Sequence, residues 1–280
     1  MEPGYSQILG FGGLIMLLVL KKYAKVYAMQ LHNNWVREAV YRTNFLTSVF
    51  VDAIWLAVEF TLFTVIYANT PSLAGWTKPQ VFFFLGVLFS GDALFTIFFT
   101  RNFWMFNDLV NKGELDILLT KPVNTLFLAL TRWINLTAVT NFMLGMAIML
   151  RFAGPAGFAG GWKWAQVPLW FLVSLATALS LRFTSSVCVF WTDRSWALSR
   201  LYYQFFGFAT KPDAIYPRGV RLVIMSVLPF AFIGSVPARA LLHGLGAWEY
   251  ALVAAVLVGF YGLNSWLWRK GLRRYQSASS

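Results

Sequence analysis

NDLVNKGELDILLTKPVNTL, residues 107–126, decides the fold because this long mixture of polar and apolar residues lies between two strongly apolar runs. Leucine, isoleucine and valine recur in it at roughly helical spacing, around a break at Gly113. Pro122 ends the segment and disfavours helix at Lys121. The pattern predicts a short amphipathic piece at the bilayer surface that offers a charged face to a soluble partner, with an ordinary connecting loop as the alternative. The charged residues are Asp108, Lys112, Glu114, Asp116 and Lys121.

The composition of the whole chain is that of an integral membrane protein. Hydrophobic residues make up 58% of the chain and charged residues only 12%, and the mean hydropathy is +0.60. An ordinary soluble domain has about 25% charged residues. The apolar runs are about 20 residues long and lack period-2 alternation, which favours helices over barrel strands. We therefore predict an all-α fold.

The charge and the rare residue types exclude several functions. The net charge is +12, but the basic residues sit in short loops beside apolar runs, so membrane topology explains them and we predict no nucleic-acid partner. Cys188 is the single cysteine, which excludes an intrachain disulfide. His32 and His243 lack neighbours at ligand spacing, and we predict no metal site.

Six transmembrane spans are predicted, and they make up one transmembrane domain over residues 45–268. The loop over residues 192–221 between the fourth and fifth spans is polar and is predicted to be cytoplasmic. The fifth span contains Pro229, Gly234 and Pro237, so a broken or re-entrant outer piece is expected near its end. The spans cover about residues 45–67, 80–100, 127–150, 165–191, 220–242 and 247–268.

Both ends of the chain lie outside these spans. The apolar run over residues 8–20 is short for a span and is followed, not preceded, by lysines, which disfavours a secretory signal. We predict an apolar extension over residues 1–20 and an amphipathic elbow helix over residues 21–44. Residues 269–280 are a basic tail. Most lysines and arginines fall on the side of residues 107–126, which places this segment and both ends of the six-span core in the cytoplasm.

Five charged residues fall inside predicted spans, where charge is costly and therefore often functional. Asp52 and Glu59 are seven residues apart and share a helix face. Carboxylates and guanidinium groups at similar depth can pair, so ties between packed helices are the favoured interpretation, ahead of direct contact with a substrate. Small residues at four-residue spacing, Gly86 with Ser90 and Ala255 with Gly259, also favour close helix approach. The charged residues within spans are Asp52, Glu59, Asp92, Arg132 and Arg182.

The chain lacks the sequence motifs of an energy-converting enzyme. It contains no phosphate-binding GxxxxGK[ST] pattern, no HExxH and no GxSxG. If the protein moves a substrate uphill, the energy must come from an ion gradient or from a separate nucleotide-hydrolysing subunit.

The central segment resembles the KGELDxxLxKPVNxLF signature of bacterial type-2 ATP-binding-cassette (ABC) export permeases, in the branch grouped with daunorubicin-type exporters. Thr125 stands where the family pattern has proline, and residues 1–20 are not part of the usual pattern. A Tyr-Arg-x-Asn-Phe entry to the first span, at residues 41–45, extends the resemblance. The matching positions in the segment are Lys112, Gly113, Glu114, Leu115, Asp116, Leu118, Leu119, Lys121, Pro122, Val123, Asn124, Leu126 and Phe127.

The resemblance implies a permease subunit in the cytoplasmic (inner) membrane that dimerises with an identical or related chain and binds two cytosolic ATPase subunits. It implies no cofactor in this chain, because the partner would bind ATP and magnesium. The loop between the second and third spans would be the coupling helix, and ATP-driven closure of the ATPases would switch the permease between inward-open and outward-open states. The implied ATPase-coupling residues are Asp108, Lys112, Gly113, Glu114, Leu115, Asp116, Lys121 and Pro122.

Three functions compete at this point. The first is an ATP-driven exporter of a lipid-like, glycan or hydrophobic substrate, although the many aromatic residues are also what bilayer-facing helices contain. The second is an ion-coupled secondary transporter that uses Asp52, Glu59 and Asp92. A membrane-embedded enzyme ranks last, because no nucleophile–base or metal constellation is visible.

Overall fold

The computed structural model describes residues 4–40, 42–158, 160–192 and 195–275, and within these ranges it is helical without a β-strand. The predicted all-α membrane fold is thereby confirmed. Four helical stretches among these residues are long and apolar enough to cross a membrane. The count of six spans stays a prediction. The four stretches are Val49–Asn69, Lys78–Asn111, Gly161–Phe190 and Ala247–Arg274.

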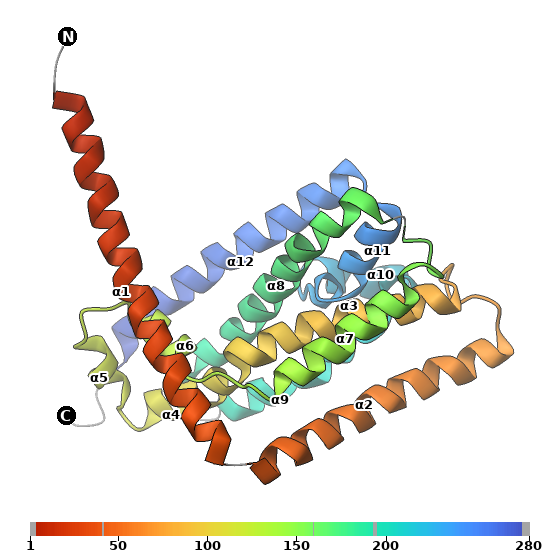
Figure 1. Cartoon of the computed structure of the whole chain (residues 1–280), viewed down its shortest axis with the longest axis horizontal. Helices are drawn as coiled ribbons and strands as arrows, with labels where there is room; N and C mark the ends of the chain where they lie inside the picture. The colour runs from red at the N-terminus through yellow and green to blue at the C-terminus, as the bar shows by residue number, and fades with distance from the viewer. Residues whose placement is uncertain (1–3, 41, 159, 193–194, 276–280) are drawn as a thin grey trace.

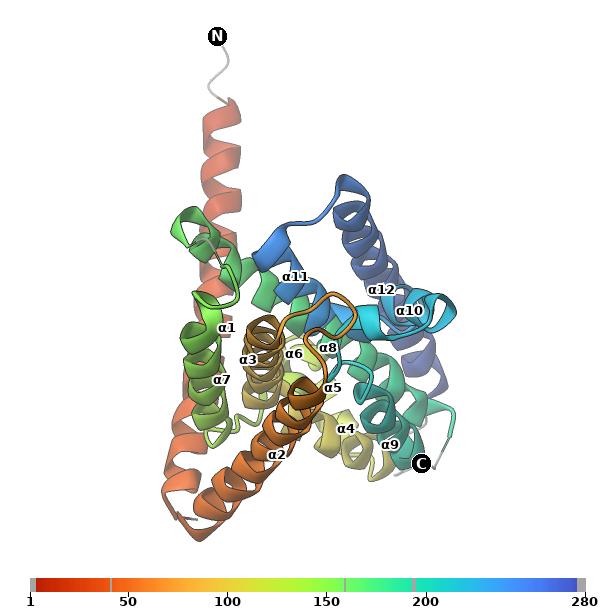
Figure 2. The same ribbon diagram turned by 90° about the vertical axis from the view of Figure 1, so that its right-hand side faces the viewer.

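Helix α3, Lys78–Phe95, forms the centre of the bundle, with α7 (Ala138–Ala153) and α8 (Val167–Val187) against it (Figure 2). Every side chain from Val81 to Leu88 is buried. Glycines let α3 and α7 approach closely: a Cβ added at Gly86 would lie 2.4 Å from the backbone nitrogen of Met149. The predicted close packing at Gly86 and Ser90 is therefore present.

The central helix continues beyond α3 to the segment that the sequence singles out. A five-residue π-helical turn, Thr96–Thr100, joins α3 to α4, Arg101–Asn111. The chain then turns sharply at Gly113, whose φ of 74° is a left-handed conformation that glycine adopts without strain. Two short helices follow, α5 (Leu115–Leu119) and α6 (Thr125–Thr131).

The predicted span over residues 127–150 is divided into α6 and α7 by a non-helical stretch after Arg132. Two asparagines explain the break. Asn102 of α4 accepts a hydrogen bond from the Trp133 backbone nitrogen at 2.8 Å and donates one to the Trp133 carbonyl at 2.7 Å. The Asn135 backbone nitrogen donates to the carbonyl of Ile97, within the π-helical turn, at 2.8 Å. These bonds replace the helical bonds that the break removes.

The region of the predicted fifth span is the main departure from the sequence-based expectation. Residues 220–242 do not form one helix, because Pro229 and Gly234 divide them into α10 (Arg218–Met225), a 3₁₀ turn (Phe230–Phe232) and α11 (Ser235–His243). The preceding stretch, predicted to be a polar loop, contains α9 (Ser195–Phe206), which packs against α8.

The ends of the bundle can be identified by α12, Ala247–Arg274, which runs along its whole length (Figure 1). Arg239 of α11 pairs with Glu249 at the start of α12 at 2.8 Å and lies 3.8 Å from Asp213, which Arg221 binds at 2.8 Å. Arg221 therefore lies at the end of the bundle opposite α5. The sequence predicts that the loop over residues 192–221 lies on the α5 side; for Arg221 this prediction is wrong, because residues 195–217 traverse the bundle without one long apolar helix.

Two further helices lie at the periphery. Helix α1, Gly4–Val40, is continuous, so the structure shows no boundary at residue 20 between extension and elbow, and its N-terminal part projects from the bundle (Figure 1). Helix α2, Arg42–Asn69, lies beside the bundle, and Phe60 stacks on Phe82 of α3 with ring centroids 4.6 Å apart. Residues 1–3 of the predicted extension, Tyr41 of the family pattern and residues 276–280 of the predicted tail lie outside the described residues.

Candidate functional site

The predicted ATPase-coupling residues form one continuous surface element between α4 and α6. Asp108 and Lys112, one helical turn apart, form an ion pair at 3.0 Å, and both side chains are more than half exposed. The Asp108 side chain raises the pKa of Lys112, by its hydrogen bond first and its charge second. Glu114, Lys121 and Pro122 are also exposed. Solvent can therefore reach most of the charges that the sequence assigned to a partner.

Helix α5 has one face in the protein and one face outside. Leu115 and Leu118 are buried in the core, as the amphipathic pattern predicted. Ile117 and Leu119 are 61% and 43% exposed. An apolar pair beside charges, on a short helix fixed by two buried leucines, has the chemistry of a docking surface.

Asp116 points elsewhere and is half-buried near the end of α12. Burial raises the pKa of the Tyr275 phenol, and the charge of the neighbouring Asp116 raises it further. The Tyr275 ring packs edge-on against Phe190 at 6.0 Å. Asp116 therefore connects α5 to the C-terminal end of the bundle.

Helix α1 holds the chain that leaves α5. Lys22 donates a hydrogen bond to the Pro122 carbonyl, and the Tyr23 hydroxyl accepts one from the Asn124 backbone nitrogen at 3.0 Å. The Tyr23 ring meets Phe127 edge-on at 4.8 Å. Further along, Thr131 donates to Gln30 at 3.2 Å and Asn34 donates to the Arg132 carbonyl at 3.0 Å.

A polar cavity of about 420 Å³ lies between α1 and this part of the chain. Arg132, one of the predicted intramembrane charges, lines it, and its guanidinium carbon lies 5.4 Å from the Trp133 ring centroid. Arg101 lies over the same ring at 4.9 Å. Glu114 and Lys121 also line the cavity, so it belongs to the same end of the bundle as the coupling surface.

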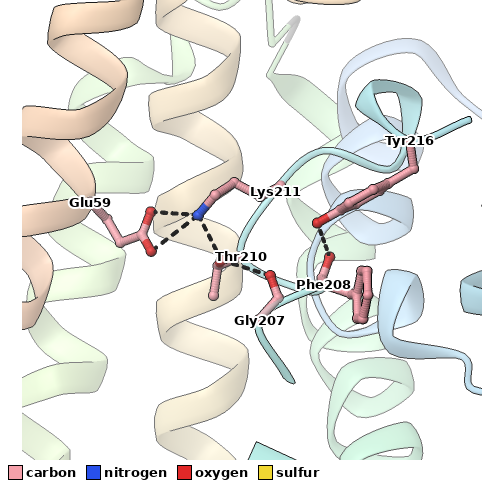
Figure 3. Close-up of polar contacts among 6 residues, drawn as sticks. All are labelled: Glu59, Gly207, Phe208, Thr210, Lys211 and Tyr216. Atoms are coloured by element: carbon pink, nitrogen blue, oxygen red, sulfur yellow. Dashed lines mark hydrogen bonds and ion pairs between the residues drawn. The ribbon is translucent and has the colours of Figure 1, made fainter. Parts of the chain in front are cut away.

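A second group of charges lies where α2 faces the bundle. Figure 3 shows Lys211 reaching Glu59, with its Nζ 3.2 and 3.3 Å from the two carboxylate oxygens and 2.9 Å from Thr210 Oγ1. Thr210 in turn donates to the Gly207 carbonyl at 3.0 Å. Tyr216 donates to the Phe208 carbonyl at 3.4 Å and so holds the same loop. The structure thus ties α2 to the stretch between α9 and α10.

The other carboxylates of the predicted intramembrane set differ in their partners. Asp52 accepts a hydrogen bond of 2.6 Å from the Asn141 amide of α7. Asp92 of α3 has neither a hydrogen bond nor an ion pair to any residue that the structure describes. Among the described residues, neither Asp52 nor Asp92 therefore forms the predicted ion pair with an arginine.

Arg182 of α8 is fully buried and sits among aromatic rings. Its guanidinium carbon lies 4.9 Å from the Tyr203 ring centroid and 5.3 Å from each of those of Trp104 and Tyr202. It donates one hydrogen bond, from Nη1 to the Ser199 carbonyl at 3.2 Å. Cation–π contacts thus stabilise its charge in place of a carboxylate.

The carboxylates Asp52, Glu59 and Asp92 line one cavity of about 670 Å³. The sequence placed only Asp52 and Glu59 on a common helix face, and α3 brings Asp92 to the same cavity. Aromatic and polar side chains complete its wall, and Lys211 contributes the positive charge. The aromatic and polar residues of this wall include Trp55, Phe89, Asn141, Tyr202, Tyr203 and Phe206.

Sequence reasoning missed several of these residues. Lys211 was assigned to a cytoplasmic loop, and its position inside an aromatic-rich stretch that includes Phe205, Phe206 and Phe208 was the available signal. Tyr23 and Tyr275 carried no signal, because their roles depend on contacts with residues that are distant in sequence.

A helical bundle of this kind, with a charged cavity inside and an anchored surface helix at one end, defines a membrane transport protein. Residues 53–279 match the profile of a family described as ABC-2 family transporter protein, and the chain belongs to this family. It is therefore an integral membrane protein of a family that forms the membrane component of ABC transporters, a transport component that is generally not an enzyme and that partners with ABC ATPase subunits. No curated protein and no solved structure matches the chain.

Proposed function

We propose that this chain is the permease subunit of an exporter in the cytoplasmic (inner) membrane, where it moves a hydrophobic or amphipathic substrate with energy from ATP. Two cytosolic ATPase subunits dock on α5 and the end of α4, and they bind the ATP and magnesium. A second permease chain, identical or related, completes the complex.

The connection between α5 and the large cavity carries this proposal. The helical stretch Lys78–Asn111 is continuous from the far end of the bundle to the turn before α5. Asp92, Thr96 and Thr100 of this stretch line the cavity. Because Leu115 and Leu118 fix α5 in the core, a force on its exposed face is transmitted to the cavity wall.

The test is purification of the tagged chain in mild detergent, with the stoichiometry of the complex measured by native mass spectrometry and its ATP hydrolysis measured directly. We expect one nucleotide-hydrolysing subunit per permease chain. Ile117→Asp should abolish its recovery, because the substitution places a charge in the apolar part of the docking surface.

Trp162→Asp is the matched control, since Trp162 is 73% exposed and precedes α8 at the opposite end of the bundle. It should leave the complex intact. Recovery of the ATPase with Ile117→Asp at the wild-type ratio would contradict docking on α5.

An ion-coupled secondary transporter is the second candidate, because three carboxylates line the same cavity. It predicts transport that follows an imposed sodium or proton gradient in the absence of ATP. Transport by reconstituted vesicles under ATP alone, or under a gradient alone, separates the two functions.

A further inference from the structure

We propose that the cavity of about 670 Å³ binds an organic cation with an apolar body, and that such cations are the class of substrate for this permease. The statement that the cation is a substrate rests on the proposed transport function. Binding of the cation to the cavity is independent of that function, and it can be measured on this chain alone.

The charges that line the cavity are unbalanced. Asp52, Glu59 and Asp92 supply three carboxylates, and Lys211 supplies one positive charge. Lys211 is already engaged by both oxygens of Glu59. Asp52 and Asp92 are therefore left without a counter-charge in the cavity lining, in an apolar surrounding where an unpaired charge is costly.

Neutral groups only partly meet the needs of these two carboxylates. Asp52 accepts one hydrogen bond from the Asn141 amide, which carries no charge. Asp92 has no polar partner within the described part of the chain. Arg182 lies behind the rings of Tyr202 and Tyr203 and is not part of the cavity lining. A cation that enters between Asp52 and Asp92 therefore gains two carboxylates that no protein cation binds.

The buried hydroxyl of Tyr202 is a second, independent observation that points to a ligand. Tyr202 lines the cavity and is only 6% exposed. Its hydroxyl has no hydrogen-bond partner among the described residues. A buried hydroxyl without a partner is unfavourable, and a small movement of the Tyr202 side chain would bring it to a polar or charged group in the cavity and relieve this cost.

The remaining lining selects the body of the ligand. Trp55, Phe89, Tyr203 and Phe206 add aromatic surface, which favours an apolar ligand and stabilises a positive charge through ring faces. The volume falls within the range of about 300–1,000 Å³ that is usual for small-molecule sites. No three Asp, Glu, His or Cys side chains in the described ranges converge closely enough to hold a metal ion, so the geometry favours an organic cation.

The test compares two probes of nearly identical shape and opposite charge, tetraphenylphosphonium and tetraphenylborate. The purified chain in nanodiscs of zwitterionic lipid is titrated with each, and binding to empty nanodiscs is subtracted. We expect saturable binding of the phosphonium that is at least about tenfold tighter than that of the borate, as complementary charges in a desolvated site allow. Equal binding of both probes, or saturable binding of neither, would overturn the proposal.

Variants then locate the site. Asp92→Asn and Asp52→Asn keep the side-chain shape, and each should weaken phosphonium binding by about tenfold or more because it removes one charge. Glu249→Gln is the control, because Glu249 lies at the start of α12, outside both the cavity lining and the coupling surface. It should bind as the wild type does.

If a cavity variant fails to fold, as thermal unfolding would show, the comparison of the two probes on the wild-type chain still decides the outcome. Wild-type affinity in a folded Asp52→Asn, Asp92→Asn double variant would overturn the proposed site. The assay contains no ATPase, so a negative result here leaves the docking experiment on α5 unaffected.

Discussion

Lys211 and Glu59 form an ion pair with Nζ–O distances of 3.2 and 3.3 Å, and this pair joins the peripheral α2 to the loop beyond α9. The Glu59 side chain is 10% exposed and that of Lys211 is 30% exposed. Other contacts that hold α2 to the bundle are the hydrogen bond between Asp52 and Asn141 and the stacking of Phe60 on Phe82.

Replacement of Lys211 by methionine should destabilise the protein, because it leaves the Glu59 carboxylate buried without a counter-charge. We expect a loss of about 2 kcal/mol, below the range for fully buried pairs since Lys211 is partly exposed. Thermal unfolding in detergent measures the effect. The double variant Lys211→Met, Glu59→Gln should recover most of it, and no difference between single and double variants would show that the pair is not a stabilising tie.

Two glycines should respond differently to replacement by alanine, because Gly86 lies in the contact between α3 and α7 and Gly259 of α12 lies in open space. Gly86→Ala places a Cβ 2.4 Å from the Met149 nitrogen, so backbone must move, and we expect a loss of about 2 kcal/mol. Gly259→Ala in α12 meets no atom within 4 Å and should be neutral or slightly stabilising, because alanine is the better helix former. The two thermal unfolding midpoints provide the test; equal midpoints would contradict the close approach.

The contact between α1 and the chain after α5 can be tested by removing the hydroxyl oxygen of Tyr23. Tyr23→Phe keeps the ring against Phe127 and removes the acceptor of the Asn124 backbone N–H. With a bond of about 1 kcal/mol, amide exchange of the peptide around residue 124 should become roughly fivefold faster. Hydrogen–deuterium exchange measures this, and peptides from α11 serve as an internal reference. Unchanged exchange around residue 124 would exclude the bond.

Tyr275 should titrate above the ordinary value of 10.0 for a tyrosine, because burial and the Asp116 charge disfavour the phenolate. The raised pKa in the folded protein means that the stabilising contribution is complete below pH 10 and is lost as the pH rises through the folded-state pKa. NMR of ¹³C-labelled tyrosine, assigned with Tyr275→Phe, follows the titration. Asp116→Asn should lower the pKa, and an unchanged pKa in this variant would show that Asp116 does not face Tyr275.

The sequence was sufficient for the features that depend on local pattern. The apolar runs predicted an all-helical membrane protein, and the alternation of charges and leucines in residues 107–126 predicted a surface segment in which Leu115 and Leu118 are buried. Seven-residue spacing placed Asp52 and Glu59 on one face, and the structure brings both to one cavity.

The sequence was insufficient where the chain crosses the bundle without a long apolar helix. The stretch from α9 to α10 contains Lys211, Asp213 and Arg221. Lys211 pairs with Glu59, which lies far away in sequence, and Asp213 pairs with Arg221 and lies 3.8 Å from Arg239. A hydropathy window assigns such residues to a loop, and it assigns residues 220–242 to one span, whereas the structure divides them into α10, a 3₁₀ turn and α11. The partners of a charge are set by tertiary packing, which no window of sequence contains.

The π-helical turn at Thr96–Thr100 determines how the cavity and α5 are oriented about a common axis. Its wide turn brings Asp92, Thr96 and Thr100 close to a single line along the cavity, and Thr100 donates to Thr96 at 3.3 Å. Return of this turn to α-helical winding would rotate everything from Arg101 onward by about 100°. The bond from the Asn135 nitrogen to the Ile97 carbonyl, made possible by the broken helix between α6 and α7, opposes that rotation. The hydrogen bond from Asn135 thus helps to fix the rotation of α5 about the helix axis relative to the charged cavity.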